Sequence, residues 1–209
     1  MKYVSLISSG IDSPVATYLL SKEAEEVVLL HADNRPFTDD REVENFVRLA
    51  KYLKSLGVSK YSAYLIPHGE TLAMYQRMSE RRFTCVFCKR MMLRYAERMA
   101  VREHADAIVM GDSLGQVASQ TLQNIRVVEQ AVKLPVLRPL IGFDKEDVVQ
   151  IAKEIGTYEF SIMKSAGCGA VPVKPSTKAS LDQVLAEEQN VDVERLVKQA
   201  IAGVQIVQL

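Results

Sequence analysis

A short polar loop close to the N-terminus has the residue types that could bind a phosphate group. The loop runs from Ser8 to Ser13, reads SSGIDS and follows the apolar run Tyr3 to Ile7. We expect a strand, then this loop, then a helix with Ser13 as its N-cap and Pro14 as its first residue. Backbone N–H groups, hydroxyls and the helix dipole would then face one point that suits an anion. The loop is neither a Walker A loop nor a GxGxxG turn. A corner that binds nothing is the alternative.

Three cysteines are the second feature that could do chemistry. Cys85 and Cys88 form a Cys-x-x-Cys pair, and Cys168 stands far along the chain. Such a pair could be half of a zinc site, a redox pair or two buried thiols. We expect the pair just before a helix that starts near Lys89, where the helix N-terminus would lower the pKa of the thiols. This cysteine usage favours metal or redox chemistry over a disulfide framework.

A third polar segment reads GDSLGQVASQT and runs from Gly111 to Thr121. It follows the apolar run Ala107 to Met110, so it begins where we expect a buried strand to end. Gly111 would allow a close backbone approach. Gln120 offers uncharged donors and acceptors that suit an adenine or ribose edge. The alternative is a capped helix start with solvated polar residues.

The elements that must position these residues alternate between strand and helix patterns. Strands are predicted over residues 3–7, 26–32, 60–67, 107–110 and 136–137. Helices are predicted over residues 14–22, 43–56, 72–78, 89–103, 118–132, 145–155, 179–188 and 191–201. The sequence therefore predicts a doubly wound α/β fold with a mainly parallel, five-stranded sheet and a short helical C-terminal extension. Its ligand crevice should lie at the carboxyl ends of the strands.

Composition limits the function classes. Lys and Arg total 26, and so do Asp and Glu, so any basic surface for nucleic acid must be local. No apolar run is long enough for a membrane span and no signal peptide is evident, so we expect a cytoplasmic protein without a membrane partner. We predict one domain over residues 1–160. Residues 161–209 would pack on it, with a loop from Ser165 to Ser176 that carries Cys168.

Several motifs together resemble one enzyme family. The SSGIDS loop closely resembles the S-G-G-x-D-S loop of the PP-loop ATP pyrophosphatases, with Ser9 in place of the first glycine. The segment from Gly111 resembles the G-[ED]-S-L-G-Q-V-[AS]-S-Q-T signature of the ThiI-type tRNA sulfurtransferases, which make 4-thiouridine. Further stretches resemble that family over most of the chain: Cys88 to Met92, Leu137 to Lys145, Cys168 to Gly169 and Pro175 to Lys178.

The resemblance implies an adenine nucleotide alpha hydrolase-like fold and an ATP-dependent sulfurtransferase. ATP would adenylate a uridine O4 of tRNA, sulfur would replace that oxygen, and AMP would leave. Asp12 would act through Mg²⁺ and Lys145 near the α-phosphate, whereas the alternative for Lys145 is a surface lysine. Nucleotide contacts are implied for a larger set: Leu6, Ile7, Ser8, Gly10, Ser13, His31, Ala32, Lys89, Gly111 and Gln120. His31 could instead be an ordinary buried histidine.

The cysteines depart from the best-known members, in which a rhodanese domain carries the persulfide. Here the resemblance implies that Cys85, Cys88 and Cys168 share one site. Three thiolates without a fourth protein ligand suit an iron–sulfur cluster with one open iron that could hold hydrosulfide. Zinc is one alternative. A redox relay in which Cys168 carries a persulfide is the other.

The resemblance also implies a partner RNA. The THUMP RNA-binding domain of longer relatives is not in this sequence, so we expect tRNA to be held by this domain, by a homodimer or by a separate RNA-binding protein. A sulfur donor is required as well. One basic stretch is predicted to contact phosphates: Arg77, Arg81, Arg82, Lys89, Arg90, Arg94, Arg98 and Arg102, against Glu80 and Glu97. A PP-loop enzyme for a small molecule and a non-catalytic ATP-binding subunit are the alternatives.

Overall fold

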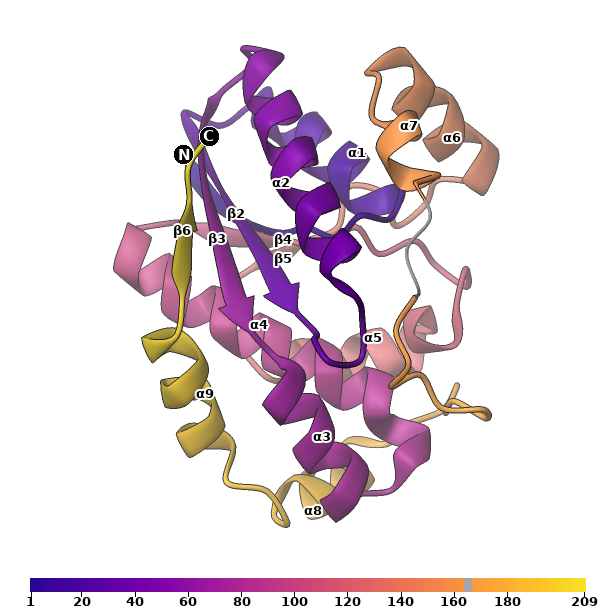
Figure 1. The fold of residues 1–209 in the computed structure, drawn as a ribbon. Helices are drawn as coiled ribbons and strands as arrows, with labels where there is room; N and C mark the ends of the chain where they lie inside the picture. The colour runs from indigo at the N-terminus through magenta and orange to yellow at the C-terminus, as the bar shows by residue number, and fades with distance from the viewer. Residues whose placement is uncertain (164–166) are drawn as a thin grey trace.

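The computed structural model describes residues 1–163 and 167–209 and has a central sheet with helices on both faces (Figure 1). The sheet order is β5-β4-β1-β2-β3-β6. Its strands are β1 (Lys2–Leu6), β2 (Glu26–Asp33), β3 (Lys60–Pro67), β4 (Ala107–Val109), β5 (Val136–Leu137) and β6 (Gln205–Val207). The first five pair in parallel. The predicted doubly wound, mainly parallel α/β fold is confirmed, and all five predicted strands are present.

The sixth strand corrects the prediction of five strands and a purely helical C-terminal extension. β6 runs antiparallel to β3 and pairs its residues with Ala63 to Leu65. The strand has only three residues, and Ile206 on it is exposed. A segment this short on the sheet edge has too few alternating residues to be recognised from sequence.

The helices form two layers. One layer holds α1 (Asp12–Ser21), α2 (Asp40–Ser55), α6 (Lys145–Glu154) and α7 (Tyr158–Ser161) (Figure 1). The other layer holds α3 (Gly69–Met78), α4 (Thr84–Glu103), α5 (Leu122–Glu129), α8 (Leu181–Glu188) and α9 (Val193–Ala202). Apolar residues at helical spacing explain why these segments are helices: in α2, the side chains of Phe46, Leu49, Ala50 and Leu53 are fully buried. None of the described helices is long and apolar enough to cross a membrane.

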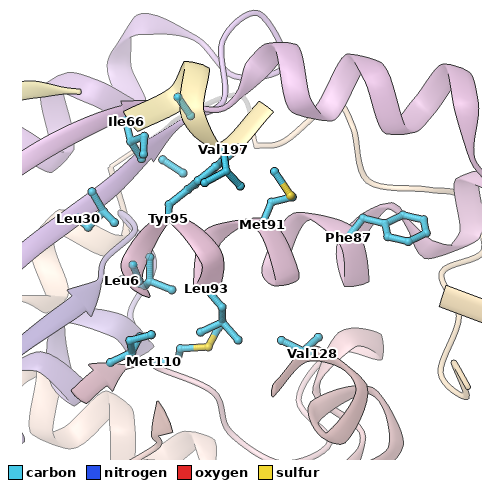
Figure 2. Close-up of a cluster of buried hydrophobic side chains, with 14 of the residues drawn as sticks. Leu6, Leu30, Ile66, Phe87, Met91, Leu93, Tyr95, Met110, Val128 and Val197 are labelled. Carbon is cyan, nitrogen blue, oxygen red and sulfur yellow. The ribbon is translucent and has the colours of Figure 1, made fainter. Parts of the chain in front are cut away.

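Helix α4 is the centre of the second layer. Its buried side chains Met91, Leu93 and Tyr95 belong to one hydrophobic cluster with residues of the sheet and of helices α5 and α9 (Figure 2). Phe87, nearer the start of α4, stacks on Tyr75 of α3. The helix begins at Thr84, five residues before the predicted start at Lys89. A short 3₁₀ turn over Arg81–Phe83 leads into it. The Cys-x-x-Cys pair therefore lies inside the helix and not before it.

The predicted helix over residues 118–132 is also divided. Ala118–Gln120 forms a 3₁₀ turn, and α5 begins only at Leu122. Thr121 caps α5, because its side-chain oxygen accepts a hydrogen bond from the Asn124 N–H. This capping residue separates two segments that the polar sequence pattern had joined.

The C-terminal segment is attached to α4 by a buried ion cluster. The Glu188 carboxylate on α8 accepts hydrogen bonds from both Arg90 and Arg94, at 2.8 to 2.9 Å. Arg90 is 1% exposed. Burial alone would raise the pKa of Glu188, but the two guanidinium groups lower it to about 2. The predicted division of the chain near residue 160 stays a prediction.

Candidate nucleotide and cysteine sites

A cleft of about 230 Å³ opens at the carboxyl ends of β1 and β4. These two neighbouring strands are the point where the strand order reverses, the usual ligand position in a doubly wound sheet. Eleven of the predicted site residues line the cleft: Leu6, Ile7, Ser8, Gly10, Asp12, Ser13, His31, Ala32, Lys89, Gly111 and Gln120. The structure therefore brings together residues from four separate parts of the sequence.

Gly111 shows why the cleft needs a glycine at the end of β4. A Cβ atom at this position would lie 2.6 Å from the backbone N and Cα atoms of Ser13. Backbone atoms cannot move aside as a flexible side chain can, so a larger residue would push β4 away from the start of α1. The glycine permits the close approach that the sequence predicts.

The polar loop differs from the prediction in its helix cap. Helix α1 begins at Asp12, with Ile11 at the N-cap position, and no described side chain caps it. The prediction of Ser13 as the cap and Pro14 as the first helical residue is wrong by two residues. The Ser13 hydroxyl instead accepts a hydrogen bond from the Ser8 N–H at 2.8 Å, which turns it toward the loop. The first-turn N–H groups of α1 are thus left to face an anion.

Charged side chains surround the loop. The Lys145 ammonium, on the first residue of α6, donates to Asp12 Oδ1 at 2.7 Å, although Lys145 does not line the cleft. Asp112 also lines the cleft and accepts from Lys89 at 2.7 Å and from Arg138 at 3.2 Å. Burial would raise the pKa of Asp112, but these two cations hold it below its usual range. The Asp112 carboxylate therefore orients the Lys89 side chain.

Two residues of this site, Asp112 and Glu42, were not predicted. Asp112 lies within the quoted motif, directly beside Gly111, so the motif could have indicated it. Arg138 follows β5, at the edge of the sheet where the crevice was expected. Glu42 comes from α2 and had no sequence signal. Its carboxylate lines the cleft and accepts a hydrogen bond of 2.7 Å from the Ser9 hydroxyl.

His31 has one nitrogen that is satisfied and one that is not. Its ring is stacked on Phe46, with centroids 4.6 Å apart. Nδ1 donates to the Ile7 carbonyl oxygen at 2.8 Å, and burial lowers the pKa of the ring, so Nε2 is left as an acceptor. Nε2 is buried and has no partner among the described residues. A satisfied core histidine would not leave this atom free.

The three cysteines lie near one another. Cys85 and Cys88 occupy the first two turns of α4, and Cys168 belongs to the loop after residue 166. Hydrogen bonds hold this loop: Gly169 N to Phe37 O at 2.7 Å, Gln76 Nε2 to Ala170 O at 3.2 Å and Ser176 N to Arg82 O at 2.9 Å. Ser165 and Ala166, the start of the predicted loop, lie outside the described residues.

The electrostatics of the thiols is opposite to the prediction. Burial raises the pKa of Cys88, and the neighbouring Cys85 and Cys168 raise it further. Burial and Cys168 likewise raise the pKa of Cys85. Desolvation and the neighbouring thiols thus outweigh the lowering effect of Lys89. Within residues 1–163 and 167–209, no three His, Cys, Asp or Glu side chains converge closely enough to hold a single metal ion.

The predicted basic stretch is not one surface. Arg90 and Arg94 bind Glu188 in the interior, and Lys89 binds Asp112. These three residues are therefore removed from the predicted phosphate contacts. Further along α4, Arg98 and Arg102 pair with Glu194 and Glu103.

A smaller basic groove remains beside Cys168. It has a volume of about 570 Å³, and Gly169 forms part of its wall. Its basic residues are Arg81, Arg82 and Lys174, all of them exposed. Of the predicted stretch, Arg81 and Arg82 line this groove, and Lys174 is added by the cysteine loop itself.

A doubly wound sheet with a phosphate-type loop and a polar cleft at its switch point defines a nucleotide-binding α/β protein. Comparison with known families makes the assignment specific. The profile of the ThiI family, described as thiamine biosynthesis protein (ThiI), matches residues 1–193, and the chain belongs to this family.

Relatives of known name agree with this assignment. A "Probable tRNA sulfurtransferase" of Methanobrevibacter smithii is 46% identical over 187 residues, covering 88% of this chain and 48% of the relative. A protein of the same name from Finegoldia magna is 40% identical over 208 residues, covering 98% of this chain and 52% of the relative. The chain thus spans about half the length of these curated relatives.

Solved structures support the fold. A crystal structure of a 4-thiouridine synthetase in complex with RNA and ATP superimposes with a TM-score of 0.93 at 32% identity, covering 99% of this chain and 55% of the other. The NMN synthetase of Francisella tularensis has a TM-score of 0.60 at 14% identity, covering 96% of this chain and 83% of the other. The second similarity concerns the fold alone.

Proposed function

We propose that this chain is the catalytic part of an ATP-dependent tRNA sulfurtransferase that adenylates a uridine and replaces its O4 with sulfur. One observation carries the proposal: helix α4 joins the two sites. Lys89 lines the nucleotide cleft, and the preceding residue, Cys88, belongs to the cysteine site. The names of the relatives and the RNA- and ATP-bound neighbour support this reading.

The phosphates of ATP would lie at the start of α1. Its uncapped N–H groups and the hydroxyls of Ser8 and Ser13 offer donors, and the helix dipole favours the negative charge. Lys145 donates to Asp12 at the start of this helix and would stabilise charge that develops on the α-phosphate. Asp12 is the carboxylate that would hold Mg²⁺, since this ion binds through one or two carboxylates together with phosphate oxygens.

The nucleoside would be recognised by unpaired acceptors. His31 Nε2 and Gln120 Oε1 are both buried without partners among the described residues. An adenine amino group or a ribose hydroxyl can donate to either atom. These two orphaned atoms are the structural support for a nucleoside in this cleft.

The reaction would proceed in two displacements. The uridine O4 attacks the α-phosphorus of ATP, the bond to the β-phosphate breaks, and pyrophosphate leaves. A hydrosulfide then adds to C4 of the adenylated uridine and loses its proton. The C4–O4 bond breaks, so AMP leaves with the former O4. No electrons are exchanged in this version, and the sulfur donor is a source of hydrosulfide.

An iron–sulfur cluster is the proposed occupant of the cysteine site. Its donors would be three sulfurs, the ligands that iron–sulfur clusters prefer. Within the described residues no three side chains are placed to hold a metal ion, so the cluster rests on the resemblance and on the type of donor. An iron with an open position would supply a binding place for hydrosulfide. Zinc and a persulfide on Cys168 are the competing outcomes.

The RNA would approach over the basic groove beside Cys168. Arg81, Arg82 and Lys174 could neutralise phosphates there, which positions a strand without reading its sequence. A homodimer, a separate RNA-binding protein or a further part of a longer protein could supply additional contacts.

ATP–pyrophosphate exchange in the presence and absence of tRNA tests the proposal. We expect exchange only with tRNA, and its loss in Asp12→Asn. Asp147→Asn, an exposed carboxylate on α6, is the matched control and should exchange normally. Exchange that proceeds fully without tRNA would favour a small-molecule substrate instead. Protein that binds ATP but never exchanges it would favour a non-catalytic subunit.

A further inference from the structure

A histidine at the carboxyl end of β3 lies against the cysteine site. His68 follows β3 and occupies the N-cap position of α3. Its ring is fully buried, and Nε2 lies 3.3 Å from the Cys88 sulfur. Nδ1 lies 3.2 Å from the Tyr95 hydroxyl, which is 2.8 Å from the hydroxyl of Thr71. A thiol, an imidazole and two hydroxyls thus form one connected series.

The position of the ring is fixed from several directions. The His68 N–H donates to the Asp33 carbonyl oxygen at 2.8 Å, and its own carbonyl accepts from Leu72 N at 3.1 Å. The edge of the ring packs against Tyr95, with centroids 5.5 Å apart. The ring is fully buried between a thiol and a hydroxyl, and a neutral imidazole in this place has one donor nitrogen and one acceptor nitrogen.

We propose that His68 is a positioning residue for Cys88, whose sulfur accepts a hydrogen bond from His68 Nε2–H. The Tyr95 hydroxyl donates to Nδ1 and thereby keeps the proton on Nε2. The sulfur chemistry that this bond serves rests on the proposed function, but the bond itself does not.

The surroundings of Cys88 explain why a hydrogen-bond donor to its sulfur would be stabilising. An anionic sulfur at Cys88, as thiolate, persulfide or iron ligand, would be repelled by negative charge on Cys85, three residues earlier on the same helix. An N–H donor stabilises a negative sulfur without adding a buried positive charge. Among the described residues, neither Cys85 nor Cys168 has a comparable side-chain donor. Cys88 should therefore be the anchored member of the three.

A histidine that only fills space would behave differently. Its two nitrogens would need partners, but the position of the proton on the ring would not matter to the sulfur. Gln places an amide N–H near the position of Nε2, whereas Leu fills a similar volume without a donor. The two replacements therefore separate hydrogen bonding from packing.

The first test is the tautomer of His68 in the metal-free, reduced protein. The chain has only three histidines, so nitrogen NMR with the His68→Gln variant assigns the ring directly. We expect the proton on Nε2 of His68 and, by contrast, on Nδ1 of His31. In Tyr95→Phe, the ring of His68 should no longer prefer a proton on Nε2 over a proton on Nδ1. A proton on Nδ1 of His68 in the wild type would overturn the proposal. This test is independent of any thiolation activity.

The second test measures iron retention after anaerobic reconstitution with iron and sulfide. His68→Leu should lose iron to a chelator about tenfold faster than the wild type, and His68→Gln should restore retention to within a few-fold. Tyr75→Phe is the control, because the Tyr75 hydroxyl is buried without a partner among the described residues. Equal rates of iron loss in the Leu and Gln variants would contradict the proposal. Thermal unfolding curves check that both variants are folded. If the wild-type protein binds no iron, the proposed iron–sulfur cluster is wrong. The tautomer test then decides the proposal for His68.

Discussion

The nucleotide cleft and the cysteine site differ in how complete they are. The cleft residues already contact one another, as in the pairs Ser8–Ser13 and Lys89–Asp112, and Lys145 contacts Asp12 from outside the cleft lining. The cysteines lie near one another but do not converge within the described residues. Strand ends and the helix that follows fix the cleft by short-range geometry, whereas the cysteine site depends on a distant loop. We infer that the cleft is preformed, whereas the cysteines within the described residues are not arranged around a single point.

The largest effect on activity is expected from a substitution that disables the cysteine site and leaves the nucleotide cleft intact. We expect Cys168→Ser to reduce thiolation of tRNA by about three orders of magnitude or more, because the sulfur-transfer group is removed. ATP–pyrophosphate exchange with tRNA should survive, since Cys168 does not line the cleft. Measuring both rates on the same preparation checks the separation. Loss of exchange together with thiolation would mean that the two sites act as one.

The buried ion cluster that attaches α8 to α4 should have the next largest effect. Glu188→Gln leaves Arg90 and Arg94 without their carboxylate in the interior, so we expect a loss of about 3 to 5 kcal/mol in the free energy of unfolding. Denaturant titration measures this loss. Glu194→Gln, whose pair with Arg98 is exposed, is the control and should cost less than about 1 kcal/mol.

The same cluster predicts a direction for the pH dependence. The pKa of Glu188 is about 2 in the folded state, below the ordinary value of 4.5. Its stabilisation is therefore complete above about pH 4.5 and is lost as the pH falls toward 2. Unfolding free energies measured across this range should decline less steeply in Glu188→Gln. An identical slope in both proteins would mean that the cluster does not control acid stability.

A moderate effect is expected at His31. Phe at this position keeps the stacking on Phe46 but removes the acceptor Nε2 and the bond to Ile7. We expect the dissociation constant of ATP to rise about tenfold, since one buried hydrogen bond to the nucleotide is lost. Calorimetry on the variant and the wild type gives this ratio. Unchanged affinity would show that Nε2 does not face the nucleotide.

The smallest effect is expected where this chain departs from the family loop. Ser9→Gly restores the first glycine of the S-G-G-x-D-S pattern and removes the Ser9–Glu42 hydrogen bond. We expect less than about a threefold change in ATP affinity, because the bond lies at the partly exposed rim of the cleft. A change of tenfold or more would make Glu42 part of the phosphate site.

The difference between the two sites also explains what the sequence could predict. The strands, the loop and the cleft follow from local patterns, because the carboxyl ends of adjacent parallel strands must meet at one edge. The start of α4 at Thr84 was missed, since Thr84 to Cys88 has no strong helix signal of its own. The burial of Arg90 was missed because its partner, Glu188, lies on a distant helix. The pKa of the thiols depends on desolvation, which only the packed structure reveals.

The most direct test of the proposed reaction follows one oxygen atom. tRNA whose target uridine carries a heavy oxygen isotope at O4 is incubated with this protein, Mg-ATP and a sulfide source, and the AMP produced is weighed by mass spectrometry. Adenylation at the cleft followed by sulfur transfer predicts that the heavy oxygen appears in the phosphate of AMP, in equal amount to the thiolated uridine. Unlabelled AMP, formed while tRNA keeps its heavy oxygen, would contradict the account.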